Sequence, residues 1–89
     1  MPTLIIPPPY QGPTRGVGRV EVAGGTVRAS LDEMERRFPG FRPQVVAETG
    51  APHRFVKLFV NGEQLERGDL ERKLDEGDEL EIVAAIAGG

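Results

Sequence analysis

A single amphipathic helix flanked by strand-like segments is the feature that most constrains this chain. Between residues 27 and 38, apolar side chains recur with the spacing i, i+4, i+7 and i+11 that places them on one face of a helix. They are Val27, Leu31, Met34 and Phe38. Thr26 stands where its hydroxyl can cap the helix, and Pro39-Gly40 ends it. Because one helix can cover only one face of a sheet, we expect a two-layer α+β domain.

Short segments with strand character lie on both sides of this helix. Asn61-Gly62 is the dipeptide most typical of a type I′ hairpin turn, and we expect a strand on either side of it. Residues 41–53 are expected to form a short helical turn plus a loop, and the spacing of Leu70 and Leu74 suggests one further helical turn. The expected strands are 2–7, 17–23, 54–60, 63–66 and 79–83.

This element order predicts how the strands are arranged. The helix would cross between strands that lie parallel, which makes the first and last strands neighbours at the centre of the sheet. The expected fold is therefore a ubiquitin-like β-grasp: a mixed sheet of four to five strands with one main helix on one face. Residues 1–89 would form one domain, with 85–89 as a flexible tail.

Length and composition favour a binding or carrier role over an enzyme. A domain of 89 residues has little room for an internal catalytic pocket, and the chain has no cysteine for a nucleophile or a thiolate metal site. No apolar run approaches the roughly 20 residues of a membrane span, and the start lacks the basic region of a signal peptide. We expect a soluble, cytoplasmic protein that is not bound to a membrane.

The distribution of charge argues against nucleic acid as a partner. Residues 1–62 hold eight Lys and Arg against five Asp and Glu, whereas residues 63–89 hold three against nine. An acidic half next to the C-terminus would repel a phosphate backbone and favours a basic protein surface as partner. Alternatively, these acidic side chains only keep the domain soluble.

The segment Ala84-Ala85-Ile86-Ala87-Gly88-Gly89 follows the last expected strand. Glycine has no Cβ, so a partner's backbone could close around Gly88 and Gly89. We therefore expect this segment to enter the active site of another protein, with the carboxyl carbon of Gly89 as the reacting atom. The alternative is an ending of no functional meaning.

The chain resembles the ubiquitin-like sulfur carriers, the family that includes the small subunit of molybdopterin synthase and the thiamine and cysteine biosynthesis carriers. Residues 82–89 are similar to the family's strand-to-diglycine ending, and residues 77–80 to the turn before its last strand. Residues 52–62, with a His-Arg-Phe-Val run and a Val-Asn end, look most like the cysteine biosynthesis carriers.

This resemblance implies a mechanism and partners. An adenylating enzyme using ATP and Mg²⁺ would activate the carboxylate of Gly89, and a sulfur donor would convert it to a thiocarboxylate that supplies a sulfur-acceptor enzyme, such as one similar to a cysteine synthase. The chain itself would be a cosubstrate, monomeric when free, with no bound cofactor or metal. Cysteine, molybdopterin, thiolated RNA and secondary-metabolite pathways stay open. The alternatives are a modifier joined to lysines through Gly89 and a plain interaction module.

Strand periodicity predicts a partner surface. Val56, Leu58 and Val60 should face the helix, which sends Phe55, Lys57 and Phe59 to the open face. Such an exposed apolar patch beside the tail indicates a partner site, unless loop 41–53 covers it. The expected partner-binding residues are Ile5, Phe55, Phe59, Val83 and Ile86, with Ala87 and Gly88 in the tail.

Two further motifs are given structural interpretations. Residues 7–10 match a PPxY ligand of peptide-binding domains, but a plain hairpin loop explains them better. His53 is the only histidine, and no cysteine or second histidine accompanies it as a metal ligand. We therefore interpret His53 as a surface residue.

Overall fold

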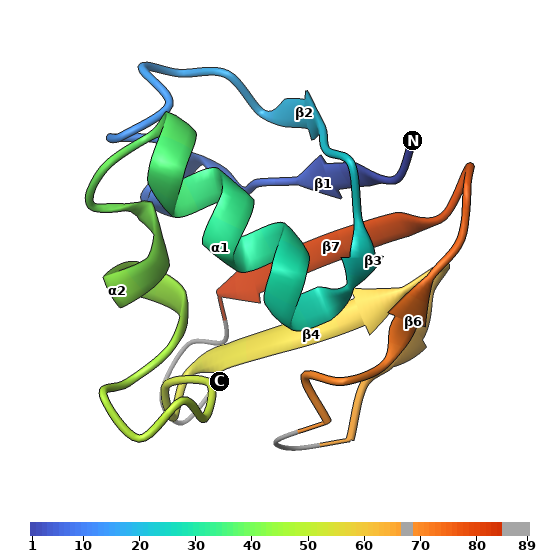
Figure 1. Ribbon diagram of the computed structural model, residues 1–89. Helices are drawn as coiled ribbons and strands as arrows, with labels where there is room; N and C mark the ends of the chain where they lie inside the picture. The colour runs from blue at the N-terminus through green and yellow to red at the C-terminus, as the bar shows by residue number, and fades with distance from the viewer. Residues whose placement is uncertain (67–68, 85–89) are drawn as a thin grey trace.

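A five-stranded mixed sheet forms one layer of the molecule (Figure 1). The computed structural model describes residues 1–66 and 69–84. In spatial order the strands are β2 (Arg19–Glu21), β1 (Thr3–Ile5), β7 (Glu79–Ala84), β4 (Val56–Val60) and β5 (Glu63–Gln64).

The first and last strands of the sheet pair in parallel near its centre, as expected from the element order. Thr3 is opposite Glu79 and Ile5 is opposite Glu81, whereas the other strand pairs of this sheet are antiparallel. β7 is therefore paired with β1 over residues 79–81 and with β4 over residues 80–84. The position of its last residue, Ala84, is determined by the sheet and does not depend on a loop.

Helix α1 (Val27–Arg37) crosses one face of the sheet (Figure 1). The Thr26 hydroxyl accepts a hydrogen bond of 3.0 Å from the Ala29 amide, so the expected N-cap is confirmed. Phe38 ends the helix as its C-cap residue. One contiguous core lies between the helix and the sheet, and includes Leu4, Val20, Leu31, Met34, Leu58, Val60, Leu80 and Ile82.

Residues 41–53 form the short helix α2 (Phe41–Val45) and a loop, as predicted. Phe41 and Val45 are buried in the core. The Glu35 carboxylate accepts hydrogen bonds from the amides of Gly40 (3.0 Å) and Arg42 (2.8 Å), which fastens the start of α2 to α1. Within residues 1–66 and 69–84, no helix is long and apolar enough to cross a membrane.

A second, two-stranded sheet of β3 (Gly25–Thr26) and β6 (Lys73–Leu74) corrects the sequence interpretation. The helical turn expected at Leu70 and Leu74 is wrong. The carbonyls of Leu70 and Arg72 accept hydrogen bonds from the first amides of α1, at 2.8 and 2.9 Å. The backbone carbonyls of this segment therefore bond to the N-terminal amides of α1, which have no partner within that helix. Leu70 and Leu74 are buried in the core although the segment is not helical.

The hairpin between β4 and β5 has the expected turn. Asn61 and Gly62 both have positive φ angles, of 52° and 83°, which is the requirement of a type I′ turn. The strand expected at 63–66 ends earlier, at Gln64. The pairing continues by one further hydrogen bond of 2.7 Å, from the Leu65 amide to the Leu58 carbonyl.

Candidate functional site

The end of β7 is the structural basis of the candidate site. Ala84 is the last residue of this strand and lies opposite Val56, the first residue of β4. The predicted site residues Ile86, Ala87, Gly88 and Gly89 lie outside the described residues. Their roles stay predictions, but the strand that precedes them is paired with β4 up to its last residue.

The face of the sheet opposite α1 carries the other predicted residues. The pairing register aligns one row across five strands: Arg19, Ile5, Glu81, Phe59 and Gln64. Ile5 and Phe59 are half-buried, and the exposed Glu81 stands between them. Val83, also half-buried, lies one step further along β7, opposite the exposed Lys57. We call Ile5, Phe59, Glu81 and Val83 the open-face patch.

The alternation predicted for β4 is confirmed. Val56, Leu58 and Val60 are 4, 3 and 1% exposed and belong to the core, while Lys57 is exposed. Phe55 precedes the strand and is 43% exposed. The alternative in which loop 41–53 covers the patch is wrong, because this segment packs on the helix side of the sheet (Figure 1).

The patch is less apolar than the sequence interpretation suggested. Glu81 makes no ion pair with any described residue, and Glu79 pairs with Arg19 at 3.0 Å. The alternation of residues 79–83 places Glu81 on the same face as Val83. Only the strand register shows that the Glu81 carboxylate lies between Ile5 and Phe59. The patch therefore suits a partner surface that combines apolar and basic groups.

His53 and residues 7–10 have local structural roles. The Nε2 atom of His53 lies 2.6 Å from the carbonyl oxygen of Pro43, within hydrogen-bond distance. Pro8–Tyr10 form a 3-10 turn, and Tyr10 packs against the core, so this segment is not presented as an extended proline ligand. Within residues 1–66 and 69–84, no cluster of three His, Cys, Asp or Glu side chains could hold a metal ion.

Comparison with known proteins gives the family. The model of the ThiS family matches residues 14–89, which is most of the chain. This chain belongs to the ThiS family. A curated relative, the sulfur carrier protein CysO of Mycobacterium tuberculosis, is 31% identical over 90 residues, covering 98% of this chain and 97% of the relative.

Two solved structures share the fold along all or nearly all of the chain. The Amycolatopsis orientalis BexX/CysO complex contains a chain that is 37% identical, with a TM-score of 0.90 and complete coverage of both chains. Mycobacterium tuberculosis CysO is 28% identical, with a TM-score of 0.89, covering 97% of this chain and all of that one. These matches confirm the family resemblance and the ubiquitin-like β-grasp fold.

Proposed function

We propose that this protein is a sulfur carrier and that the carboxylate of Gly89 is the group that carries sulfur. The observation that supports this most directly is the family match, which continues through Gly89 and therefore includes the tail as well as the fold. The relatives named as sulfur carriers agree with it. Among the possible pathways we favour cysteine biosynthesis, because those relatives are named CysO and because residues 52–62 resemble the carriers of that pathway.

The chemistry follows from the carboxylate. At neutral pH it is ionised and a poor electrophile, so it must be activated. A partner enzyme using ATP and Mg²⁺ would join the carboxylate to AMP and release pyrophosphate. A sulfur nucleophile would then attack the carbonyl carbon and displace AMP, which leaves a thiocarboxylate on Gly89. The carrier thus acts as a cosubstrate, and its sulfur would be delivered to an acceptor enzyme.

The fold would contribute position. β7 is paired with β4 as far as Ala84, which lies opposite Val56, so the tail begins from a point fixed by the sheet. The open-face patch lies on the same strand and on its neighbours, and we propose that it docks on the activating or acceptor enzyme. The solved complex of a CysO with BexX supports a protein partner of this kind.

Intact mass spectrometry tests the proposal. Incubation with the cognate adenylating enzyme, ATP and sulfide should add a mass equal to the difference between sulfur and oxygen. A variant lacking Gly89 should gain nothing and yet melt at the same temperature, because removal of one tail residue costs little stability. If that variant still accepts sulfur, the mechanism at the terminal carbon is wrong. Conjugates of higher mass would indicate a modifier instead.

A second substitution tests the requirement for bare backbone next to the reacting carbon. Gly88→Val should block adenylation, because a β-branched side chain would stand where the partner closes around the chain. The measurement is pyrophosphate exchange with the activating enzyme, and Ala87→Gly provides a matched control with no added bulk. Unchanged exchange by Gly88→Val would contradict the steric argument.

A further inference from the structure

Charged side chains on the open face of the sheet follow an order along the strands. Glu21 and Glu79 lie in one row, because both pair with the same residue of β1. The next row on this face holds one charge of each sign, Arg19 and Glu81. Lys57 lies in the row after that, opposite the last residue but one of β7. The charge on this face therefore changes from negative to positive in the direction in which β7 runs toward the tail.

The loops before β7 extend the negative side of this gradient. Asp75, Glu76 and Asp78 lie in the turn that leads into β7, and Glu63 begins β5 at the same end of the sheet. We call these four residues the acidic end. The two ends of β7 are about 17 Å apart, at about 3.4 Å per residue. This separation exceeds the Debye length of about 8 Å at physiological ionic strength, so the acidic end has little influence where the tail begins.

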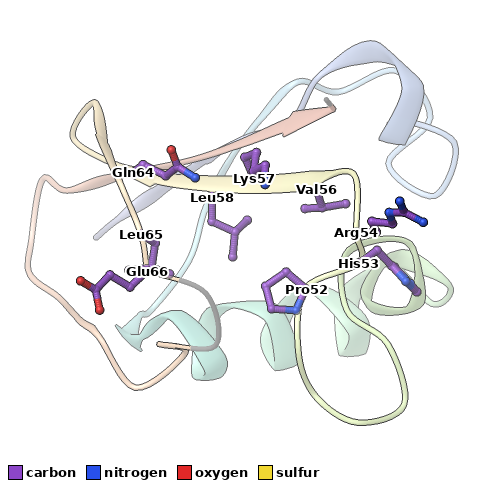
Figure 2. A pocket seen from close by; sticks show the side chains of 9 residues that line it. All are labelled: Pro52, His53, Arg54, Val56, Lys57, Leu58, Gln64, Leu65 and Glu66. Carbon is purple, nitrogen blue, oxygen red and sulfur yellow. The ribbon is translucent and has the colours of Figure 1, made fainter. Parts of the chain in front are cut away.

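The end of the sheet from which the tail leaves is basic. Because β4 runs antiparallel to β7, it begins where β7 ends, with Val56 opposite Ala84. Arg54 is exposed two residues before this pair, and its guanidinium lies 5.4 Å from the centre of the Phe55 ring. Figure 2 shows Arg54 at the beginning of β4 and Lys57 on the side of that strand away from α1. We call Arg54 and Lys57 the basic end.

Two further exposed carboxylates come close to the basic end along the chain or across the sheet, Glu48 and Glu66. Glu48 lies in the tip of a loop in which a Cβ on Gly50 would lie 3.9 Å from the Arg28 guanidinium, so a cation of α1 is already beside this tip. Glu66 lies on the other side of β4 from Lys57 (Figure 2). Among the described residues, no ion pair joins either carboxylate to the basic end.

We propose that the activating enzyme carries acidic residues around the entrance through which the tail passes, and that Arg54 and Lys57 bind them. This assignment rests on the proposed function and adds the chemistry of the partner. The activating enzyme is the partner because activation of the Gly89 carboxylate is required both of a sulfur carrier and of a modifier joined to lysines.

The strand directions reverse the interpretation of the linear charge distribution. The sequence favours a basic partner surface, because its C-terminal half is acidic. In the fold, however, the acidic end precedes β7 and the tail follows it. A basic group of the partner is still expected opposite Glu81 in the open-face patch, and acidic groups are expected where the tail enters. A carrier with this polarity would approach such an entrance with its tail forward.

The two lysines of the chain give a direct test, because Lys57 belongs to the basic end and Lys73 lies in β6 of the second sheet. Both are exposed. A carbodiimide condenses a lysine amine with a carboxylate that touches it. With the full chain and the activating enzyme, mass spectrometry of the digested complex should find Lys57 joined to an aspartate or glutamate of the enzyme, and Lys73 should remain unlinked.

Charge reversal measures the contribution of the basic end. Lys57→Glu should raise the KM for the carrier in pyrophosphate exchange about tenfold at low salt and leave kcat unchanged, because the contact governs encounter and not chemistry. Lys73→Glu makes the same change of net charge and should leave the KM unchanged. The KM of the native chain should rise with salt, and that of Lys57→Glu should not. Equal melting temperatures of the variants show that each is folded.

Three results would overturn the assignment. Lys73 could cross-link to the enzyme as readily as Lys57, or the two charge reversals could have the same effect on the KM. In the absence of enzyme, the carbodiimide could join Lys57 to Gly89, which would make the chain's own tail the partner of this lysine.

Binding measured without ATP separates this assignment from the proposed function. A chain lacking Gly89 keeps the basic end and should bind the activating enzyme with the same dependence on salt. If the native chain binds in this manner and gains no sulfur, the carrier function is wrong and the acidic entrance stands. If Lys57→Glu gains sulfur with the native KM, the carrier function stands and the acidic entrance is wrong. A chain that neither binds nor gains sulfur overturns both.

Discussion

The two faces of the five-stranded sheet are built from the same strands but differ in how far their side chains are buried. On the helix side, Leu4, Leu58, Leu80 and Ile82 are at most 3% exposed and form a dry core. On the other side, the open-face patch keeps its apolar side chains half-buried around a carboxylate. Alternation along each strand thus separates residues of the core from residues that stay accessible on the face where we propose that a partner docks.

The largest expected effect of this difference is on stability. Leu58→Ala should lower the free energy of unfolding by about 2–5 kcal/mol, because it removes buried methyl groups and leaves a cavity under α1. Chemical denaturation monitored by circular dichroism measures this change. A loss well below 1 kcal/mol would mean that the helix side of β4 is not a packed core.

The neighbouring position on the other face should behave in the opposite manner. Phe59→Ala should weaken binding to the activating or acceptor enzyme by about 1–3 kcal/mol, since aromatic side chains often dominate interface energies. Its effect on unfolding should be smaller than that of Leu58→Ala, because Phe59 is only half-buried. Calorimetric titration and thermal melts of both variants decide the matter. Normal binding together with a melting temperature as low as that of Leu58→Ala would contradict the division between the faces.

A substitution in the helical layer sharpens the comparison. Thr26→Ala removes the cap of α1 and should destabilise the fold by about 1 kcal/mol. Because Thr26 is remote from the open-face patch, affinity for the enzyme partners should not change. Thr26→Ser is the matched control and should retain most of the stability. A lower affinity of folded Thr26→Ala would show that the two faces are coupled.

The smallest effect concerns pH. Hydrogen bonds from the Asn61 side chain and from the Asp75 amide lower the pKa of Asp78, next to the sheet. In the helical layer, hydrogen bonds from the Gly40 and Arg42 amides lower the pKa of Glu35. A carboxyl whose pKa is lowered by folding stabilises the fold above its unfolded pKa, and this contribution is lost as pH falls through the folded value.

We therefore expect the native chain to lose stability below about pH 4, the ordinary range of these carboxyl groups. The native chain should be more stable than Asp78→Asn or Glu35→Gln at neutral pH, and this difference in the free energy of unfolding should shrink as the pH falls through that range. Denaturation at a series of pH values measures it. A difference that does not vary with pH would show that the ionised carboxylates make no contribution.

The sequence predicted the main sheet and helix because their patterns extend over several residues. Three such patterns are confirmed: the helical spacing of the apolar residues in α1, the turn at Asn61-Gly62, and the alternation of buried and exposed side chains in β4. β3 and β6 have two residues each, too few for any period to be visible. The spacing of Leu70 and Leu74 imitates a helical turn, although both leucines reach the core from a segment whose carbonyls bond to α1.

The candidate site was predictable in part for a related reason. Periodicity assigns side chains to a face, so the positions of Ile5, Phe59 and Val83 on the open face follow from sequence. It does not give the register between strands, and Glu81 becomes the centre of the patch only through its pairing with both Ile5 and Phe59.

The parallel pairing of β1 with β7 also has a consequence for how the chain folds. Thr3 and Glu79 come from opposite ends of the sequence, so the central pair of the sheet forms only after a long loop closes. Contacts of this kind slow folding. An intermediate without β7 would leave β1 and β4 as adjacent unpaired edges, the situation in which chains aggregate. We therefore expect refolding yield to fall steeply with protein concentration for any variant that weakens β7.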